Sequence, residues 1–225
     1  MPGAPDPLEK AKEAAGRAAV EYVVDGMLVG LGTGSTVYWT VRELARRGLR
    51  VECVATSVAT EKLAHECGLR LLDPADVDSL DIAIDGADEV DPRLNLTKGG
   101  GGAHTREKIV AAMSERFLVV VDETKLVDKL GAFGTPVEVL PFAPAFVEDK
   151  LSELGAQRVR RRDTPTDNGG IVVDAYFGQI DDPDSLDASI RSIPGVVEVG
   201  LFPGSWVERV IVGHRDGSVR EITRR

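Results

Sequence analysis

The sequence predicts an α/β protein with two domains, in which a parallel sheet covered by helices is joined to a smaller α+β unit. Apolar segments alternate with helical segments through the first half of the chain, and the order changes to strand, helix, strand, strand, helix, strand after residue 130. A length of 225 residues suits one main domain with a smaller companion. We expect residues 1–132 and 206–225 to form the main domain and residues 133–205 the smaller one.

The first helix is predicted from its capping residues. Asp6 is a suitable N-cap, Pro7 suits the first helical position, and Glu9 can act as the capping partner three residues later. A helix therefore runs through "EKAKEAAGRAAVEYVV" and ends by Gly26.

The rest of the main domain alternates between strand and helix. Strands are expected where short segments are almost entirely apolar, and helices where apolar residues follow helical spacing. The expected strands are 27–32, 50–55, 69–72, 82–85 and 117–122, and the expected helices are 35–48, 58–67 and 104–115. Apolar strands that alternate with helices indicate a parallel, Rossmann-like sheet with helices on both faces.

The smaller domain is expected to be ferredoxin-like, with the order βαββαβ. Its expected strands are 137–140, 157–162, 171–177 and 196–202, and its expected helices lie near 144–154 and 183–193. The final segments, 209–214 and 218–222, flank Asp216 and Gly217 and are typical of a hairpin, which we expect to return to the first sheet.

Composition excludes several classes of partner. The 27 Lys and Arg residues are outnumbered by 37 Asp and Glu residues, and a net charge of −10 argues against nucleic acid or an anionic membrane surface. No segment is long and apolar enough to span a membrane. Cys53 and Cys67 form no disulfide framework, which suits a reducing cytosol, and the three histidines have no metal-ligand spacing.

Three loops that follow strands of the predicted sheet are unusual, and ligands bind at this edge of a parallel sheet. The first is "GLGTGST" (30–36), in which glycines thin the backbone before a helix and Ser35 and Thr36 add hydroxyls. Amides at a helix start favour phosphate or another oxyanion. The spacing matches neither a dinucleotide fingerprint nor a P-loop, and a plain glycine turn is the alternative.

The second loop is "DGADEVD" (85–91), with four carboxylates in seven residues. Asp85 ends an apolar strand and Gly86 permits a sharp turn, so we expect Asp85 and Asp88 to be the inward pair. A solvated turn or a cation site are the alternatives, but the spacing fails the EF-hand pattern and we expect no metal.

The third loop is "KGGGGAHTREK" (98–108), which places bare amides between Lys98 and Glu107. Glu107 by itself would be an ordinary solvated helix residue, and His104 a residue of the helix start. Together the three loops supply a base, oxyanion donors and further carboxylates, as proton abstraction next to a carbonyl requires.

"GLGTGSTV", "DGADEVD" and "KGGGGAHTREK", in this order, strongly resemble the motifs of type A ribose-5-phosphate isomerases, and the likeness extends to "PVEVLPFA", "TDNGGIVVD" and "IPGVVEVGLF". The resemblance implies interconversion of D-ribose 5-phosphate and D-ribulose 5-phosphate through a cis-enediolate, in the non-oxidative pentose phosphate pathway. It also implies no metal or organic cofactor, a cytoplasmic location and a homodimer or homotetramer.

The resemblance assigns roles to four residues: Glu107 is the general base, Lys98 stabilises the oxyanion, and Asp85 and Asp88 hold sugar hydroxyls and assist ring opening and proton movement. The division of roles between Asp85 and Asp88, and the orientation of the substrate, stay open. The substrate-binding residues that it implies are Thr33, Gly34, Ser35, Thr36, Asp85, Gly86, Ala87, Asp88, Lys98, Gly99, Gly100, Gly101, Glu107 and Lys125.

Two stretches depart from the family pattern. His104 stands where an apolar residue is common, and "VATSVAT" (54–60) replaces a loop rich in serine or threonine. We expect neither to touch a residue with assigned chemistry. Two rival functions remain: a sugar-phosphate sensor, which the lack of a helix-turn-helix segment and the acidic charge disfavour, and an isomerase or deaminase of amino-sugar phosphates, which would need a further acid.

Overall fold

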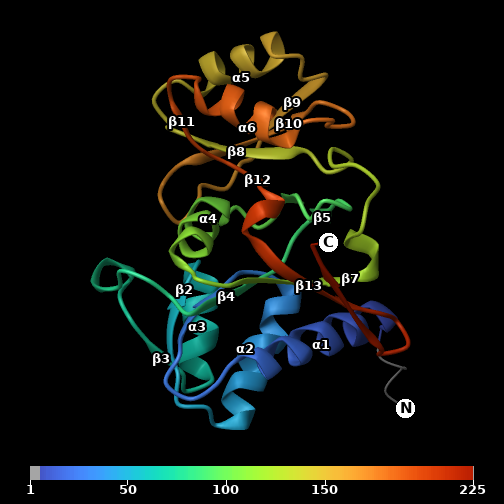
Figure 1. Ribbon diagram of the computed structural model, residues 1–225. Helices are drawn as coiled ribbons and strands as arrows, with labels where there is room; N and C mark the ends of the chain where they lie inside the picture. The colour runs from blue at the N-terminus through green and yellow to red at the C-terminus, as the bar shows by residue number, and fades with distance from the viewer. Residues whose placement is uncertain (1–5, 225) are drawn as a thin grey trace. The chain divides into compact units, whose positions relative to one another are not determined.

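The computed structural model describes residues 6–224, which form two compact units (Figure 1). The first unit takes the chain up to Gly86, then Ile109–Lys125, and then from Trp206 onward, and the second takes Ala87–Lys108 and Leu126–Ser205. These units differ from the expected domains at residues 87–108 and 126–132, which group with the second unit. The domain boundaries expected from the sequence stay a prediction.

The first unit is built on a seven-stranded sheet with the order β14-β13-β7-β4-β1-β2-β3. All neighbours are parallel except the hairpin β13–β14. In chain order the six parallel strands read 3-2-1-4-5-6, which is the Rossmann order. The strands are β1 (Leu28–Leu31), β2 (Glu52–Ala55), β3 (Arg70–Leu71), β4 (Ile82–Asp85), β7 (Phe117–Asp122), β13 (Val207–Gly213) and β14 (Val219–Thr223).

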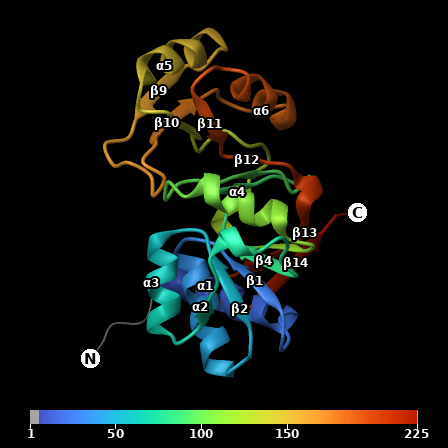
Figure 2. The same ribbon diagram turned by 90° about the vertical axis from the view of Figure 1, so that its left-hand side faces the viewer.

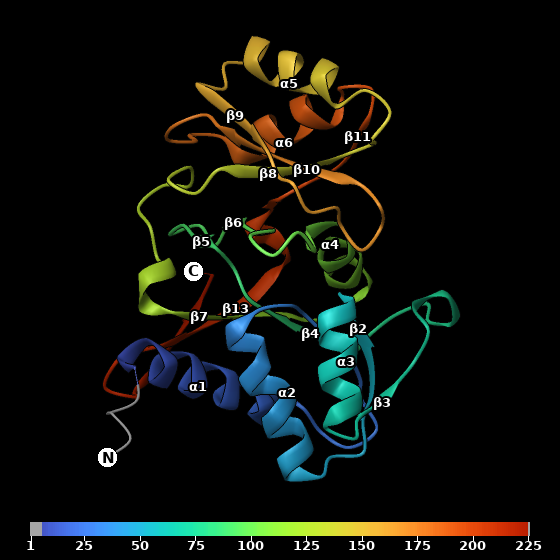
Figure 3. The same cartoon turned by 180° about the vertical axis from the view of Figure 1, so that it is seen from behind.

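The helices of this unit begin at the residues that local signals predict. Asp6 caps α1 (Pro7–Ala19) by accepting from the amide of Leu8, and Gly48 ends α2 (Ser35–Arg47) in the left-handed conformation. α3 spans Val58–Glu66 and α4 spans His104–Met113; α2 and α3 are seen beside each other in Figure 3.

The first helix is shorter than expected. α1 ends at Ala19, and Val20–Tyr22 continue as a 3-10 turn instead of an α-helix that reaches Gly26. Val23 is already extended and buried, because the chain must turn there towards the start of β1 while keeping its apolar side chains in the core.

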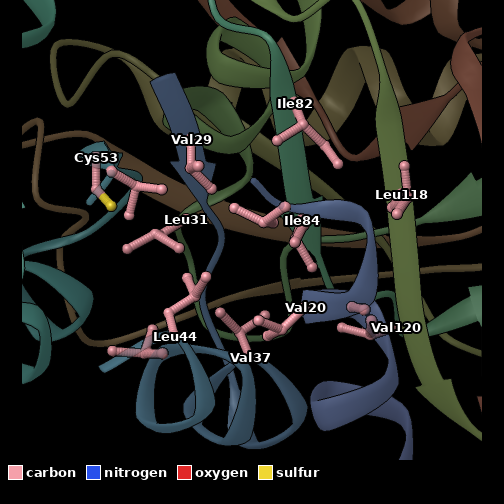
Figure 4. Packing of buried hydrophobic residues seen from close by; sticks show 14 of the residues in the cluster. Val20, Val29, Leu31, Val37, Leu44, Cys53, Ile82, Ile84, Leu118 and Val120 are labelled. Atoms are coloured by element: carbon pink, nitrogen blue, oxygen red, sulfur yellow. The ribbon is translucent and has the colours of Figure 1, made fainter. Parts of the chain in front are cut away.

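The core of the first unit shows why helices cover both faces of the sheet. Val29 and Leu31 of β1 pack with Val37 and Leu44 of α2 in one buried cluster (Figure 4). The intervening Gly30 faces the other way, where a Cβ would lie 2.4 Å from Val110 of α4. Successive residues of β1 therefore face opposite sides of the sheet, and a helix covers each side, as the sequence predicted.

The C-terminal hairpin completes this sheet. β13 runs parallel to β7 from Val207 opposite Phe117 to Gly213 opposite Asp122, and β14 pairs with β13 at the edge. The predicted return of the hairpin to the first sheet is confirmed.

The second unit contains a four-stranded antiparallel sheet with the order β11-β8-β10-β9. The chain passes through it as βαββαβ, so the predicted ferredoxin-like unit is confirmed. Figure 2 shows the two helices with this sheet, and their apolar residues share one core cluster with it. The elements are β8 (Thr135–Val139), α5 (Pro144–Glu153), β9 (Arg158–Arg161), β10 (Ile171–Tyr176), α6 (Pro183–Arg191) and β11 (Val196–Val199).

The expected strand 196–202 is wrong, because it breaks at Gly200 into β11 and β12 (Leu201–Phe202), which belong to different sheets. Gly200 passes so close to the chain at Lys98 that a Cβ would lie 2.2 Å from the carbonyl oxygen of Lys98. β12 pairs with β6 (Leu96–Thr97), which pairs with β5 (Glu89–Val90), and the sequence signals neither short strand.

Within residues 6–224, the helices are all too short or too polar to cross a membrane.

Candidate active site

Lys98 and Glu107 meet in the second unit, as their shared loop suggests. Lys98 follows β6 and Glu107 lies in the first turn of α4, and the Nζ of Lys98 is 3.3 Å from Oε2 of Glu107. The two side chains are 2% and 5% exposed. The ammonium offsets the cost of burying the carboxylate charge, and this pairing places a potential base beside a potential oxyanion donor.

The glycines between them form a tight turn that a chain with side chains would not adopt. Gly99 and Gly102 have φ values of 108° and 77°, in the left-handed region, and the amide of Gly102 donates to the carbonyl of Gly99 at 2.9 Å. A Cβ on Gly100 would lie 2.6 Å from Asp88. The peptide groups of this loop are therefore not covered by side chains of the loop itself, as they would be with residues of any other type.

The start of this loop rests on an aromatic ring. The Nζ of Lys98 lies 5.4 Å and that of Lys108 4.8 Å from the ring centroid of Phe202, and the amide of Lys98 donates to the carbonyl of Gly200 at 2.8 Å. Lys108 also donates to the carbonyl of Val199 and to Glu198 at 3.0 Å. Burial lowers the pKa of Lys108, while the nearby carboxylate of Glu198 favours its charged form. These partners give Lys108 a structural role.

Asp88 is held against residues 99–102, the four glycines that we call the glycine loop. Its Oδ2 accepts from the amide of Gly100 at 2.7 Å, and its own amide donates to the carbonyl of Thr97 at 2.8 Å. Asp88 is half-buried, so one carboxylate oxygen is committed to the loop while the side chain retains access to solvent. Asp88, Lys98 and Glu107 thus share one loop region of the second unit.

Asp85 lies in the first unit, at the carboxyl end of β4. It is buried, and its Oδ1 accepts from the amides of Thr33 at 3.1 Å and Gly86 at 2.7 Å. A Cβ on Gly32 would lie 1.9 Å from this oxygen, so the glycine is needed for the loop after β1 to approach β4. β1 and β4 flank the point where the Rossmann order reverses, which is the usual ligand position in such sheets.

The loop 33–36 has the features of an anion-binding helix start. Gly34 is the N-cap of α2 at φ 130° and provides no side-chain cap for the amides of Ser35 and Thr36. Uncapped amides and the helix dipole favour a negative group there. Lys125 follows β7, the next strand along from β4, at the end of a 3-10 turn, Glu123–Lys125. The predicted residues therefore fall into one group in each unit.

A cluster of hydroxyls beside Thr33 was missed from the sequence. Its Oγ1 lies 2.9 Å from Thr56 Oγ1, 2.7 Å from Ser57 Oγ and 3.2 Å from Thr60 Oγ1, and Thr60 donates to the carbonyl of Gly32 at 2.8 Å. Residues 54–60 therefore contact Thr33, which the family resemblance assigns to substrate binding. Three hydroxyl residues in five positions at the N-cap of α3 were the available signal.

His104 packs against the backbone of the glycine loop. It is fully buried, and its ring packs so closely on the backbone of Gly99 that a Cβ there would lie 2.7 Å from Nδ1. Burial lowers the pKa of His104 to about 4, so the ring is neutral at physiological pH. A neutral, buried ring supports the loop and is a poor acid at that pH.

The remaining acids of "DGADEVD" have structural partners. Glu89 is buried and accepts from the Thr97 hydroxyl at 2.8 Å and from the amides of Gly131 and Phe133 at 2.9 and 2.8 Å. Asp91 accepts from the amide of Asn95 at 2.8 Å. Over residues 6–224, no group of three or more His, Cys, Asp and Glu side chains is arranged to hold a metal ion.

Comparison with known proteins identifies a family. Residues 52–217 match the family model described as ribose 5-phosphate isomerase A (phosphoriboisomerase A). A relative named ribose-5-phosphate isomerase A from Methanosarcina acetivorans is 50% identical over 223 residues, which cover 95% of this chain and 94% of the relative. A protein of the same name from Methanothermobacter thermautotrophicus is 49% identical over 216 residues, covering 92% of this chain and 95% of that protein.

Solved structures agree with this match. Ribose 5-phosphate isomerase A from Methanocaldococcus jannaschii has a TM-score of 0.90 at 42% identity, covering 96% of this chain and 99% of that chain. A D-ribose-5-phosphate isomerase in complex with phospho-erythronic acid has a TM-score of 0.92 at 38% identity, with the same coverage of 96% and 99%.

Proposed function

The chain belongs to the ribose 5-phosphate isomerase A family, and we propose that Glu107 and Lys98 carry out this family's interconversion of D-ribose 5-phosphate and D-ribulose 5-phosphate. The observation that supports this assignment is the buried pair that they form beside the glycine loop. The reaction needs a base for a C–H proton and a donor for the oxygen that becomes negative, and these two groups have that chemistry.

In the proposed mechanism the carboxylate of Glu107 removes the proton from C2 of the open-chain aldose. The electron pair of that C–H bond forms the C1–C2 double bond, and the carbonyl electrons move to O1, which gives a cis-enediolate. The ammonium of Lys98 and the loop amides stabilise the oxyanion. A proton then passes from O2 to O1, Glu107 returns its proton to C1, and the C2 carbonyl of the ketose forms.

Asp85 and Asp88 are proposed to hold the sugar hydroxyls and to assist ring opening and the transfer between O2 and O1. Their backbone partners support this role, since amides that hold one carboxylate oxygen fix the direction of the other. The start of α2 is the best candidate for an anionic group of the substrate. The further proposed substrate-binding residues are Thr33, Gly34, Ser35, Thr36, Gly86, Ala87, Gly99, Gly100, Gly101 and Lys125.

The proposed reaction moves protons within one substrate, so its chemistry calls for no redox cofactor. We place it in the non-oxidative pentose phosphate pathway, which uses both pentose phosphates. A homodimer or homotetramer in the cytoplasm is proposed from the family resemblance, and the free cysteines Cys53 and Cys67 fit a reducing compartment.

The decisive experiment is an isomerase assay with ribose 5-phosphate beside a panel of other sugar phosphates, including glucosamine 6-phosphate. We expect the highest kcat/KM for ribose 5-phosphate and no release of ammonia from the amino sugar. A preference for another sugar phosphate would reject the substrate assignment, and ammonia release would favour the deaminase alternative.

A further inference from the structure

The glycine loop has no side chains of its own between Lys98 and Ala103, so other residues must hold its peptide groups in place. Arg162, the residue that follows β9, does so. Its Nη1 donates to the carbonyl oxygens of Gly99 at 2.8 Å and Gly100 at 3.1 Å. Two successive peptide groups of the loop are therefore tied to one guanidinium.

The guanidinium is itself held by a carboxylate. Nε and Nη2 of Arg162 donate to the two oxygens of Asp174 at 2.8 and 2.6 Å, and Asp174 is only 9% exposed. Asp174 lies in β10 between Val173 and Ala175, which face the helices of this unit, so its own side chain faces the opposite side of the sheet. A planar two-point pair of this kind fixes both position and orientation.

Holding the carbonyls also sets the direction of the amides. None of the peptide bonds in the described part of the chain is cis, and in a trans peptide the N–H points away from the C=O. The amides of Gly100 and Gly101 are therefore directed away from Arg162. The amide of Gly100 accordingly donates to Asp88, at 2.7 Å.

We propose that Arg162, fixed by Asp174, is a positioning residue that keeps the Gly100 amide on Asp88 and aims the Gly101 amide at the developing enediolate. The inference rests on the proposed function of the loop. Glycine segments lose much conformational freedom when they are ordered, and oxyanion donors are effective only when their dipoles are already directed. Arg162 supplies that order without touching the substrate.

The test compares Arg162→Ala with the wild type in steady-state kinetics and in calorimetric titration with phospho-erythronic acid, whose carboxylate resembles the two oxygens of the enediolate. Misplaced donors cost about 10²-fold in rate, so kcat should fall by that order while KM changes little. The Kd for the analogue should rise in parallel. The stoichiometry of the titration counts the folded sites, so a smaller active fraction cannot imitate this result.

Arg162→Lys keeps the charge but lacks the planar fork, and we expect it to recover only a minor part of the lost rate; it carries the test if the alanine variant does not fold. The matched control is Arg161→Ala, since the neighbouring Arg161 is an exposed residue whose Nε pairs with Glu148 on α5 at 2.6 Å. It should keep wild-type values.

If the wild type is active and a folded Arg162 variant binds the analogue with the wild-type Kd, the positioning role is overturned and the proposed function is not affected. A rate that falls only in proportion to the folded fraction would do the same. A wild type that fails to isomerise ribose 5-phosphate would reject the proposed function, and this inference with it.

Discussion

The ammonium of Lys98 and the carboxylate of Glu107 lie 3.3 Å apart inside the protein, although one follows a strand and the other lies in the first turn of a helix. A buried pair of this kind depends on both members, because removal of one leaves the other charge uncompensated. Changes at these two residues should therefore affect stability as well as catalysis.

Glu107→Gln should abolish the proposed base while keeping the size of the side chain. We expect kcat to fall by about 10²- to 10⁴-fold with little change in KM, because general base catalysis contributes a factor of that order. Steady-state kinetics with ribose 5-phosphate measure the effect. Glu115→Gln, at an exposed residue just after α4, is the control and should be fully active. Full activity in Glu107→Gln would exclude Glu107 as the base.

Lys98→Met should remove one oxyanion donor, at a cost of about 3 to 4 kcal/mol in transition-state stabilisation. The variant should also unfold more easily, since it leaves the charge of Glu107 buried without the ammonium. The double variant Lys98→Met/Glu107→Gln should recover part of that stability. Urea unfolding of the four proteins measures the coupling; strictly additive effects would contradict it.

Thr33→Val should disturb the hydroxyl cluster, because Thr56, Ser57 and Thr60 would face a methyl group where the hydroxyl of Thr33 lies. Each buried hydroxyl left unsatisfied costs about 1 to 3 kcal/mol. We expect a lower melting temperature and a higher KM, and recovery of both in Thr33→Ser. An unchanged KM in Thr33→Val would show that this cluster does not shape the loop 33–36.

His104 should make folding stability depend on pH. Burial lowers its pKa to about 4 from 6.5, so between these values the unfolded chain binds a proton that the folded protein does not. The contribution of His104 to the free energy of unfolding should be fully present above pH 6.5. It should be lost as the pH falls towards 4, by roughly 3 kcal/mol in total. His104→Leu should flatten the profile in this window, and His65→Gln, an exposed histidine in α3, should not. Equal slopes in all three proteins would refute the assignment to His104.

Chelation tests the acidic loop. Because the proposed mechanism assigns its carboxylates to sugar hydroxyls, activity should persist after dialysis against EDTA. The assay should follow ketose absorbance directly, since coupling enzymes can themselves require metal ions. Loss of activity that added divalent cations restore would make the loop 85–91 a metal site.

Much of the fold could be predicted because its signals are local. Asp6 and Pro7 mark the start of α1 and Gly48 marks the end of α2 within a few residues of the chain. The alternation of apolar strands with helices predicted the parallel sheet. The short strands β5, β6 and β12 were not predicted as separate elements. Each has two residues, which are too few to show a periodicity.

The sequence by itself determined the two fold classes and the three loops in which the candidate residues lie, because periodicity, capping and loop composition are encoded by neighbours along the chain. Only the tertiary structure decided which groups meet there. It broke the expected strand at Gly200, placed three hydroxyls around Thr33 and tied the glycine loop to Arg162. Such contacts join residues far apart in the chain, and their energies depend on a burial and geometry that exist only once the chain has folded.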